Sequence, residues 1–204
     1  ELVKIDPKAI GVGQYQHDMP QARLDETLSG VVEDCVNAVG VDVNTASAPL
    51  LTRVSGLTAA TAKNIVLYRE EHGAFTARKQ LLKVSKLGPK AFEQCAGFLR
   101  VPESPDVLDR TAVHPESYAA ARKLLELCGY TLDDVEGGGL DQLEDRARAY
   151  GLDRAAEECG VGVPTLTDVM AELRKPGRDP RDELPKPILR TDVMEMKDLK
   201  EGME

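Results

Sequence analysis

The sequence contains no tryptophan and few other aromatic residues. Its 204 residues include three Phe and five Tyr, although hydrophobic types make up 42% of the chain. A core built from such a composition relies on Leu, Val and Ala, as helical packing commonly does. The shortage of aromatic residues therefore favours helices over a β-sandwich, and the length allows one large domain or two small ones.

Long hydrophobic runs are also absent. No stretch approaches the roughly 18 to 20 consecutive apolar residues of a membrane span, and no charged-then-apolar signal segment opens the chain. We therefore expect a cytoplasmic protein that does not contact membranes. The four cysteines are widely spaced within helix-like runs, unlike a disulfide framework or a paired CxxC zinc site. We expect reduced core thiols at Cys35, Cys95, Cys128 and Cys159.

The sequence lacks the short motifs that mark many enzyme active sites. It has no GxxxxGK phosphate loop, no HExxH zinc motif and no GxSxG nucleophile elbow. His17, His72 and His114 lie far apart and have no companions at metal-ligand spacing. The adjacent acidic pairs at 133–134 and 157–158 diverge in direction on a helix, so we expect them on solvated faces. The sequence therefore predicts no catalytic residue, no bound metal and no cofactor.

Positive charge is scarce overall but concentrated in one segment. The whole chain carries a formal net charge of −9, which by itself argues against binding to phosphates. Residues 47–101 nevertheless hold nine Lys or Arg and three Glu, a net charge of +6. Such a local excess is typical of a nucleic-acid-binding surface, and the whole-chain charge conceals it.

Hydrophobic spacing and helix breakers divide the chain into several parts. Residues 1–20 contain Pro and Gly at irregular intervals and are expected to form a lead-in. Apolar residues then recur at helical spacing from 21 to 39, and Gly40 ends the pattern, so a long amphipathic helix is predicted. A further helix is expected at 115–127, at the start of an acidic helical unit. The proline-rich stretch 176–187 is expected to be a linker.

Two stretches match each other when the sequence is shifted by thirty residues. Val54-Ser55-Gly56-Leu57 aligns with Val84-Ser85-Lys86-Leu87, and each stretch lies between two helix-like segments. The pattern is typical of tandem helix-hairpin-helix motifs. It predicts helices at 48–54 and 59–72 in the first copy, and at 77–84 and 89–99 in the second.

The helix-hairpin-helix motif joins two helices through a tight turn of the form hydrophobic-x-Gly-hydrophobic-Gly. The glycines allow backbone angles that other residues avoid and let the turn approach a phosphate closely. The following helix adds unpaired N–H groups and its positive dipole end. Contacts of this kind hold the sugar-phosphate backbone and do not read bases, so the motif predicts sequence-independent binding.

Each copy keeps only one glycine of the pair. In the first copy Gly56 is present and Thr58 takes the second position. In the second copy Lys86 replaces the first glycine and Gly88 is retained. A lysine at the turn can compensate by meeting a phosphate as a point charge. The alternative interpretation is a compact helical module that joins other domains, with its lysines on solvated faces.

Several longer runs of residues carry a resemblance to a known family. They begin with Ile10-Gly-Val-Gly-Gln-Tyr-Gln-His17-Asp18 and continue through Val54-Ser-Gly-Leu57 and Leu87-Gly-Pro-Lys-Ala-Phe-Glu-Gln-Cys-Ala-Gly-Phe-Leu-Arg100. They end with Val113-His-Pro-Glu-Ser-Tyr118 and Lys197-Asp-Leu-Lys-Glu-Gly-Met203. Over essentially its whole length the chain resembles the bacterial Tex family of transcription accessory proteins.

This resemblance implies an all-α fragment with a tandem helix-hairpin-helix domain followed by a second small helical domain. It also implies that the fragment comes from a longer protein that ends in an OB-fold RNA-binding domain. The expected parts are a lead-in from a preceding YqgF-like domain at 1–20, a connecting helix at 21–46, the tandem domain at 47–111, the second, acidic helical domain at 112–175, and a linker toward the OB-fold at 176–204.

At the motif positions the resemblance also implies a set of binding residues. Leu57 and Leu87 are expected to anchor the hairpins between their helices and not to touch a ligand. The candidate nucleic-acid-binding residues are Ser55, Gly56, Lys63, Ser85, Lys86, Gly88 and Lys90.

Two functions remain open on the sequence. The first is a module for transcription that binds DNA or RNA and grips the phosphodiester backbone without sequence specificity. The second is a scaffold that positions neighbouring domains or contacts RNA polymerase or other transcription machinery, with nucleic-acid binding supplied mainly by the OB-fold. An enzyme such as a repair glycosylase is disfavoured, because Glu93 lies too early for its catalytic carboxylate and no Asp follows until Asp106.

Overall fold

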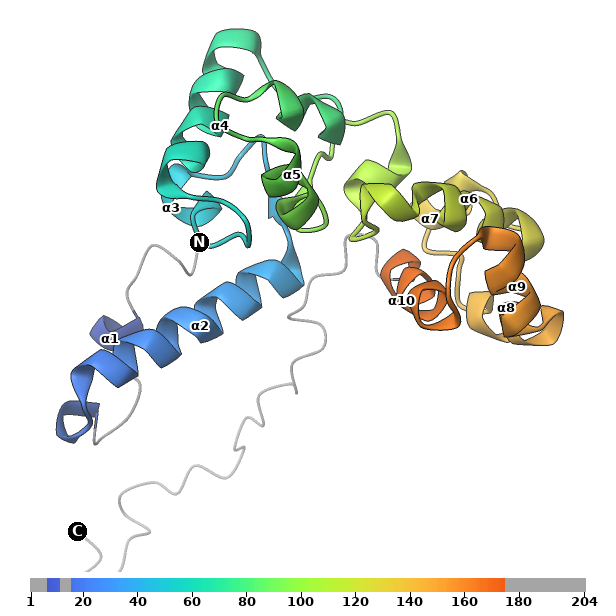
Figure 1. Cartoon of the computed structure of the whole chain (residues 1–204), viewed down its shortest axis with the longest axis horizontal. Coiled ribbons are helices and arrows are strands. Elements are labelled where there is room, and N and C mark those ends of the chain that lie inside the picture. The colour runs from blue at the N-terminus through green and yellow to red at the C-terminus, as the bar shows by residue number, and fades with distance from the viewer. Residues whose placement is uncertain (1–6, 12–15, 175–204) are drawn as a thin grey trace, which may run out of the picture.

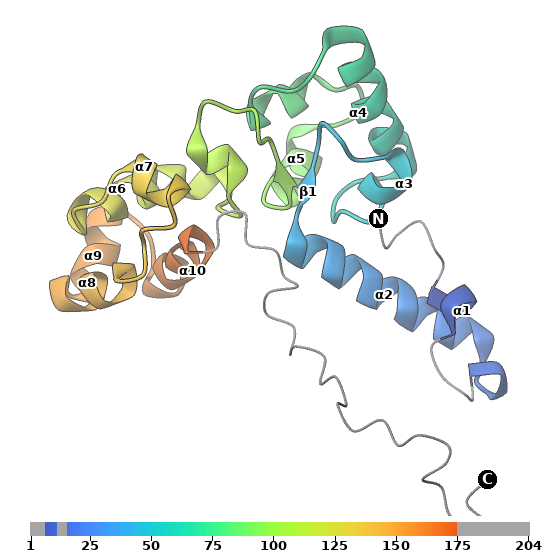
Figure 2. The same ribbon diagram turned by 180° about the vertical axis from the view of Figure 1, so that it is seen from behind.

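The computed structural model describes residues 7–11 and 16–174 as a largely helical protein (Figure 1). The helices form two groups, the tandem region and the C-terminal helices, and α2 leads away from the first group (Figure 2). The linker expected at 176–204 and part of the lead-in expected at 1–20 lie outside the described residues.

A long helix precedes the tandem region. α2 covers Gln21–Val39, the bounds that the hydrophobic spacing predicts. Leu24 and Val36 are its buried residues, because most of the helix lies beyond the tandem core. Two short elements come before it, α1 (Pro7–Ile10) and the 3-10 helix η2 (Gln16–Asp18). An ion pair of 2.6 Å between Lys8 and Asp25 holds α1 against α2.

The tandem region contains the two expected helix pairs, each joined by a tight turn. α4 has its predicted bounds, whereas the helix expected at 48–54 ends at Leu51. In the second pair the first helix is a 3-10 helix and the last helix ends earlier than expected. The first pair is α3 (Ala48–Leu51) and α4 (Ala59–His72), and the second pair is η3 (Arg78–Lys83) and α5 (Pro89–Cys95).

A short parallel sheet closes the tandem region. β1 (Val41–Asp42) follows α2 and pairs with β2 (Leu99–Arg100), with Val41 opposite Leu99. The predicted helix at 89–99 therefore stops at Cys95, because the residues that follow turn back to form this strand. Among the described residues this pair is the only sheet, so the all-α prediction is confirmed with one small addition.

Both helix pairs share one hydrophobic core. Leu51 and Leu81, which align in the repeat, are both fully buried in it. Leu57 and Leu87 also belong to this core, so both leucines anchor their hairpins as predicted. Neither helix pair could bury its apolar side without the other, which explains why the motif occurs in tandem.

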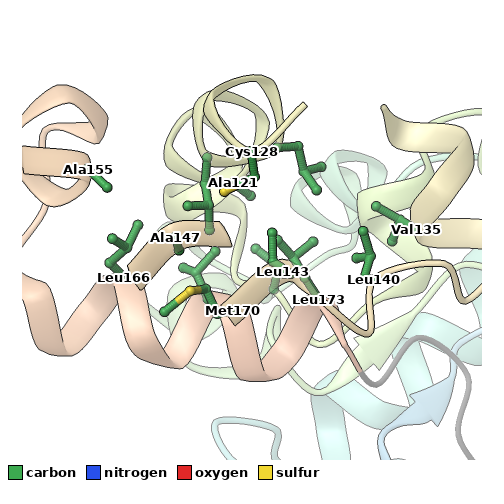
Figure 3. Packing of buried hydrophobic residues seen from close by; sticks show 14 of the residues in the cluster. Ala121, Cys128, Val135, Leu140, Leu143, Ala147, Ala155, Leu166, Met170 and Leu173 are labelled. Atoms are coloured by element: carbon green, nitrogen blue, oxygen red, sulfur yellow. The ribbon is translucent and has the colours of Figure 1, made fainter. Parts of the chain in front are cut away.

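The C-terminal helices build a second core. In Figure 3, Leu143 and Ala147 of α8 face Leu166, Met170 and Leu173 of α10. The inward residues of α10 recur at helical spacing, as an amphipathic helix requires. The elements of this group are η4 (Val107–Arg110), η5 (Pro115–Ser117), α6 (Tyr118–Leu127), α7 (Leu132–Glu136), α8 (Leu143–Tyr150), α9 (Leu152–Cys159) and α10 (Val163–Leu173).

A fully buried arginine joins the two groups. Arg78, at the start of η3, donates hydrogen bonds to the carbonyl oxygens of Asp109, Thr111 and Val113 at 3.0, 2.7 and 2.8 Å. It also donates to the Tyr118 hydroxyl at 2.7 Å, and its own backbone N–H donates to the Asp109 carboxylate. Burial lowers the pKa of Arg78, while Tyr118 and Asp109 oppose that shift. The segment after the tandem region thus wraps around a side chain of that region.

The four cysteines differ in their burial. Cys95 and Cys128 are buried, Cys159 is half-buried and Cys35 is exposed. The prediction of four core thiols is therefore wrong for Cys35, because no part of the described structure covers this side of α2. Burial raises the pKa of the Cys95 thiol to about 12, and it also raises the pKa of Cys128 and of Cys159.

Candidate nucleic-acid interface

The first turn needs its glycine for packing within the domain. Gly56 has a φ of 82°, and a Cβ at this position would lie 2.6 Å from the Cβ of Gln94 on α5. The backbone angle and the close approach both favour glycine. The missing Cβ therefore makes room for α5 of the other copy, which is a different role from the close approach to a phosphate that the motif predicts.

The second glycine of the first turn is replaced by a helix cap. Thr58 precedes α4, and its hydroxyl accepts a hydrogen bond from the N–H of Thr61 at 3.3 Å. In return the Thr61 hydroxyl accepts the N–H of Thr58 at 2.7 Å. These two bonds form a capping box, so threonine starts the helix at a position where the general motif has glycine.

The second turn follows the same backbone path with a lysine in place of the first glycine. Lys86 has a φ of 65°, the one positive φ of a non-glycine residue in the described part of the chain. Gly88 then precedes α5 in an extended conformation, with Pro89 in the first helical turn. The N–H of Leu87 donates to the Val84 carbonyl at 3.1 Å, as that of Leu57 does to Val54 in the first turn.

Each turn packs against the longer helix of the other copy. The side-chain amide of Asn64 on α4 donates to the Ser85 carbonyl at 2.7 Å. In the shifted alignment Asn64 corresponds to Gln94, the residue against which Gly56 packs. The tandem pair is therefore pseudo-symmetric, and the beginning of α4 lies beside the second turn.

The structure brings the candidate residues together at two neighbouring turns. Ser85, Lys86, Gly88 and Lys90 all belong to the second turn and the helix that follows it. Lys63 comes from the exposed side of α4, one residue before the Asn64 that contacts this turn. Ser55 and Gly56, in contrast, belong to the first turn.

The second turn carries a concentration of uncompensated positive charge. Lys63, Lys86 and Lys90 are exposed, and so are Lys79 and Lys83 on η3. None of these five side chains forms an ion pair with any of the residues that the structure describes. A surface of this kind attracts polyanions, because no internal carboxylate neutralises it.

The C-terminal group contains two more turns of the same kind, which the sequence reading missed. Gly129, with a φ of 72°, links α6 to α7, and Gly160, with a φ of 70°, links α9 to α10. Gly160-Val161-Gly162 retains both glycines of the motif. This pair of glycines is the sequence signal from which the turn between α9 and α10 could have been predicted. The acidic pairs 133–134 and 157–158 flank these turns, so the charge does not favour phosphate binding there.

A cleft with several charged residues in its lining lies where α2, α5 and α10 meet. Its cavity volume is about 470 Å³, and Arg100, His114, Glu93 and Glu172 are among the residues that line it. Burial and, to a smaller extent, the positive charge of Arg78 together lower the pKa of Arg100 to about 10, whereas Glu172 opposes the shift. With carboxylates on both sides, this cleft suits a polyanion less well than the second turn.

The described part of the chain offers neither a metal site nor a membrane-spanning helix. No group of three His, Cys, Asp or Glu side chains is placed there to hold a metal ion. None of the helices in residues 7–11 and 16–174 combines the length and the apolar character needed to cross a membrane.

Comparisons with protein families agree with the geometry of the turns. A family described as helix-hairpin-helix motif matches residues 36–100, and one described as HHH domain matches residues 106–181. The C-terminal group, predicted only as a small helical domain, is thus a helix-hairpin-helix domain as well.

Known relatives match the chain over its whole length. It is 52% identical over 203 residues to the transcriptional accessory protein Tex of Neisseria gonorrhoeae, covering 100% of this chain and 26% of that protein. The protein tex of Bordetella pertussis is also 52% identical over 203 residues, covering 100% of this chain and 25% of that protein. The human S1 RNA-binding domain-containing protein 1 is 35% identical over 255 residues, covering 99% of this chain and 25% of that protein. The chain spans about a quarter of the length of these relatives, and it belongs to the Tex family as a segment with two helix-hairpin-helix domains.

Proposed function

We propose that this segment binds nucleic acid through its tandem helix-hairpin-helix domain and holds the phosphodiester backbone without sequence specificity. The observation that carries the proposal is the second turn, where Lys86 and Lys90 are exposed, unpaired within the described residues and close to the beginning of α4 with Lys63. Lysine ammonium groups meet phosphates as point charges and gain affinity by releasing condensed counterions.

The aromatic residues of the tandem region support contact with the backbone and not with bases. Tyr68 stacks on His72 and on Phe75, with ring centroids 4.3 and 5.1 Å apart. Phe92 and Phe98 are partly buried against the core, so no aromatic ring stands free between residues 47 and 101. Proteins that grip single strands through their bases normally offer such rings as stacking platforms.

Nucleic-acid titrations test this proposal. Labelled duplex and single-stranded oligonucleotides are titrated with the 204-residue chain at several salt concentrations, and then with the triple variant Lys63→Ala, Lys86→Ala, Lys90→Ala. On duplex DNA each lost phosphate contact should reduce the slope of log K against log salt by about 0.9, and the triple variant by about 2.7 in total.

The control variant is Lys123→Ala, which removes a positive charge from the acidic C-terminal group, where Lys123 pairs with Glu126. It should leave the affinity and the salt slope unchanged. A chain that binds neither kind of oligonucleotide at low salt would rule the proposal out.

A second function is favoured by the Arg78 contacts. A fully buried side chain that binds three carbonyl groups of the following segment gives the two helix-hairpin-helix domains a fixed relative orientation. The same segment can therefore act as a scaffold that positions the neighbouring parts of a longer protein, with nucleic-acid binding supplied mainly elsewhere. Retained affinity in a full-length relative that lacks residues 47–101 would favour this scaffold role.

For the longer protein we propose a non-catalytic role in transcription, with RNA polymerase or other transcription machinery as a partner. The support is the name of the relative in Neisseria gonorrhoeae, a transcriptional accessory protein. The test is whether RNA polymerase co-purifies with the full-length protein and is lost when residues 21–174 are deleted.

A further inference from the structure

We infer that the two turns of the tandem domain have different roles: α2 occupies the first turn from within the molecule, and the second turn alone is open to a polyanion. This inference rests on the proposed function and specifies which part of the domain carries it. It follows from hydrogen bonds and charges at positions that the thirty-residue repeat makes equivalent.

Asn37 of α2 forms hydrogen bonds with both the backbone N–H and the hydroxyl of Ser55 in the first turn. The backbone N–H of Ser55 donates to the side-chain oxygen of Asn37 at 3.1 Å. The side-chain amide of Asn37 in turn donates to the Ser55 hydroxyl at 3.0 Å. The Asn37 oxygen therefore accepts the hydrogen bond that a phosphate oxygen would accept from this turn.

The same helix engages the nearest positive charge of the first turn. Arg53 donates from its guanidinium to the Ser29 hydroxyl of α2 at 2.6 Å. Ser29 and Asn37 are eight residues apart, so they lie about two helical turns apart on a similar face of α2. The helix thus covers both a backbone donor and the guanidinium of the first hairpin.

The equivalent groups of the second turn make no such contacts. Ser85 corresponds to Ser55, and its backbone N–H and hydroxyl form no hydrogen bond within the part of the chain that the structure describes. Lys83 corresponds to Arg53, and it has no partner among the same residues. The repeat therefore provides an internal comparison in which one turn is occupied and the other is open.

The second turn is also more positively charged than the first. Lys86 of the second turn corresponds to Gly56, and Lys90 corresponds to Ala60. Lys63, beside the second turn, corresponds to Glu93 on α5, the helix that packs on the first turn. Each exchange gives the second turn a positive charge where the first turn has a neutral or negative residue.

Backbone amide hydrogen exchange of the 204-residue chain, followed by NMR with and without a short DNA duplex, tests this division. Without DNA, the Ser55 amide should exchange about fivefold more slowly than the Ser85 amide, since a net hydrogen bond is worth about 1 kcal/mol. Asn37→Ala should remove that difference. Added duplex should slow exchange at Ser85 and Lys86 and leave Ser55 unchanged.

Binding measurements on matched variants complete the test. Lys86→Ala should weaken binding and reduce its salt slope, whereas Arg53→Ala and Asn37→Ala should leave both unchanged. Added duplex that protects Ser55, or an Arg53→Ala variant as weak as Lys86→Ala, would overturn the inference while the proposed function stands. If the duplex protects no amide, the proposed function is wrong, and so is the inference that the second turn binds a polyanion. The Ser55 rate in Asn37→Ala then still decides whether α2 occupies the first turn.

Discussion

Gly56 and Lys86 adopt the same left-handed backbone conformation, with φ values of 82° and 65°, although they are chemically very different residues. A residue with a Cβ is destabilised in this region by about 1–2 kcal/mol. The second turn therefore carries a local energetic cost that the first turn avoids. A charged side chain placed there against its conformational preference suggests a use for the charge.

Replacing Lys86 with glycine should stabilise the fold and weaken the proposed binding at the same time. Lys86→Gly removes the left-handed strain, so the free energy of unfolding should rise by about 1 kcal/mol. Urea unfolding followed by circular dichroism measures the stability, and the oligonucleotide titration measures the affinity. The matched variant Gly56→Ala should lower stability instead, because its Cβ would lie 2.6 Å from Gln94. Equal stability of Lys86→Gly and the unchanged chain would argue against strain at this turn.

The thiols offer a second test at the scale of single residues. Cys35 is exposed, whereas burial raises the pKa of Cys95, Cys128 and Cys159 and keeps these thiols protonated near neutral pH. Since the thiolate is the reactive form, one thiol should react rapidly with a thiol reagent at neutral pH in the folded protein. Mass spectrometry should show one label in the folded chain, four after unfolding and none in folded Cys35→Ser. Rapid labelling of Cys35→Ser would contradict the burial of the other three.

At the scale of the elements, the sequence predicts best where one local pattern decides the structure. The helix at 21–39 has its predicted bounds because apolar residues recur at helical spacing up to Gly40, and the helix at 59–72 has them because Thr58 caps its start and Gly73 follows its end. The predicted helix at 89–99 extends too far, because residues 99–100 pair with β1 at 41–42. A strand contact between residues so distant in the chain leaves no signal in a local apolar pattern.

The candidate interface, like the helices, was predictable from the sequence only in part. Shifted repeats and clustered lysines predict both turns as candidate binding sites from the sequence, and the structure places Lys63 near the second turn through Asn64. The occupation of Ser55 by Asn37 was not predictable, because it joins residues eighteen positions apart through side-chain hydrogen bonds. The turns at Gly129 and Gly160 were not predicted, because acidic residues surround them and no cluster of lysines marks them.

A buried network around Arg78 connects the two helix-hairpin-helix domains of the molecule. Asp109 accepts hydrogen bonds from the Arg78 backbone, the Ser104 hydroxyl and the Tyr118 hydroxyl, at 2.9, 2.9 and 2.7 Å. Arg78 and Asp109 are both buried, and the Arg78 guanidinium donates to the Asp109 carbonyl oxygen. The link between the domains thus depends on a buried hydrogen-bond network in which the terminal guanidinium nitrogens of Arg78 are all bonded and its Nε has no partner among the described residues.

Arg78→Met should therefore separate the unfolding of the two domains. Loss of the guanidinium leaves the buried carbonyl oxygens of Asp109, Thr111 and Val113 without their donor, which should lower the free energy of unfolding by about 3–5 kcal/mol, since each unsatisfied buried group costs about 1–3 kcal/mol. Urea unfolding should change from one cooperative transition to two, because the domains no longer share the network. The control is Arg122→Met, which breaks an ion pair with Asp106 in which the arginine is 47% exposed, and it should cost less than about 1 kcal/mol. If Arg78→Met unfolds in one transition with nearly unchanged stability, the two domains are held together by their surrounding apolar contacts, and the buried arginine does not determine their orientation.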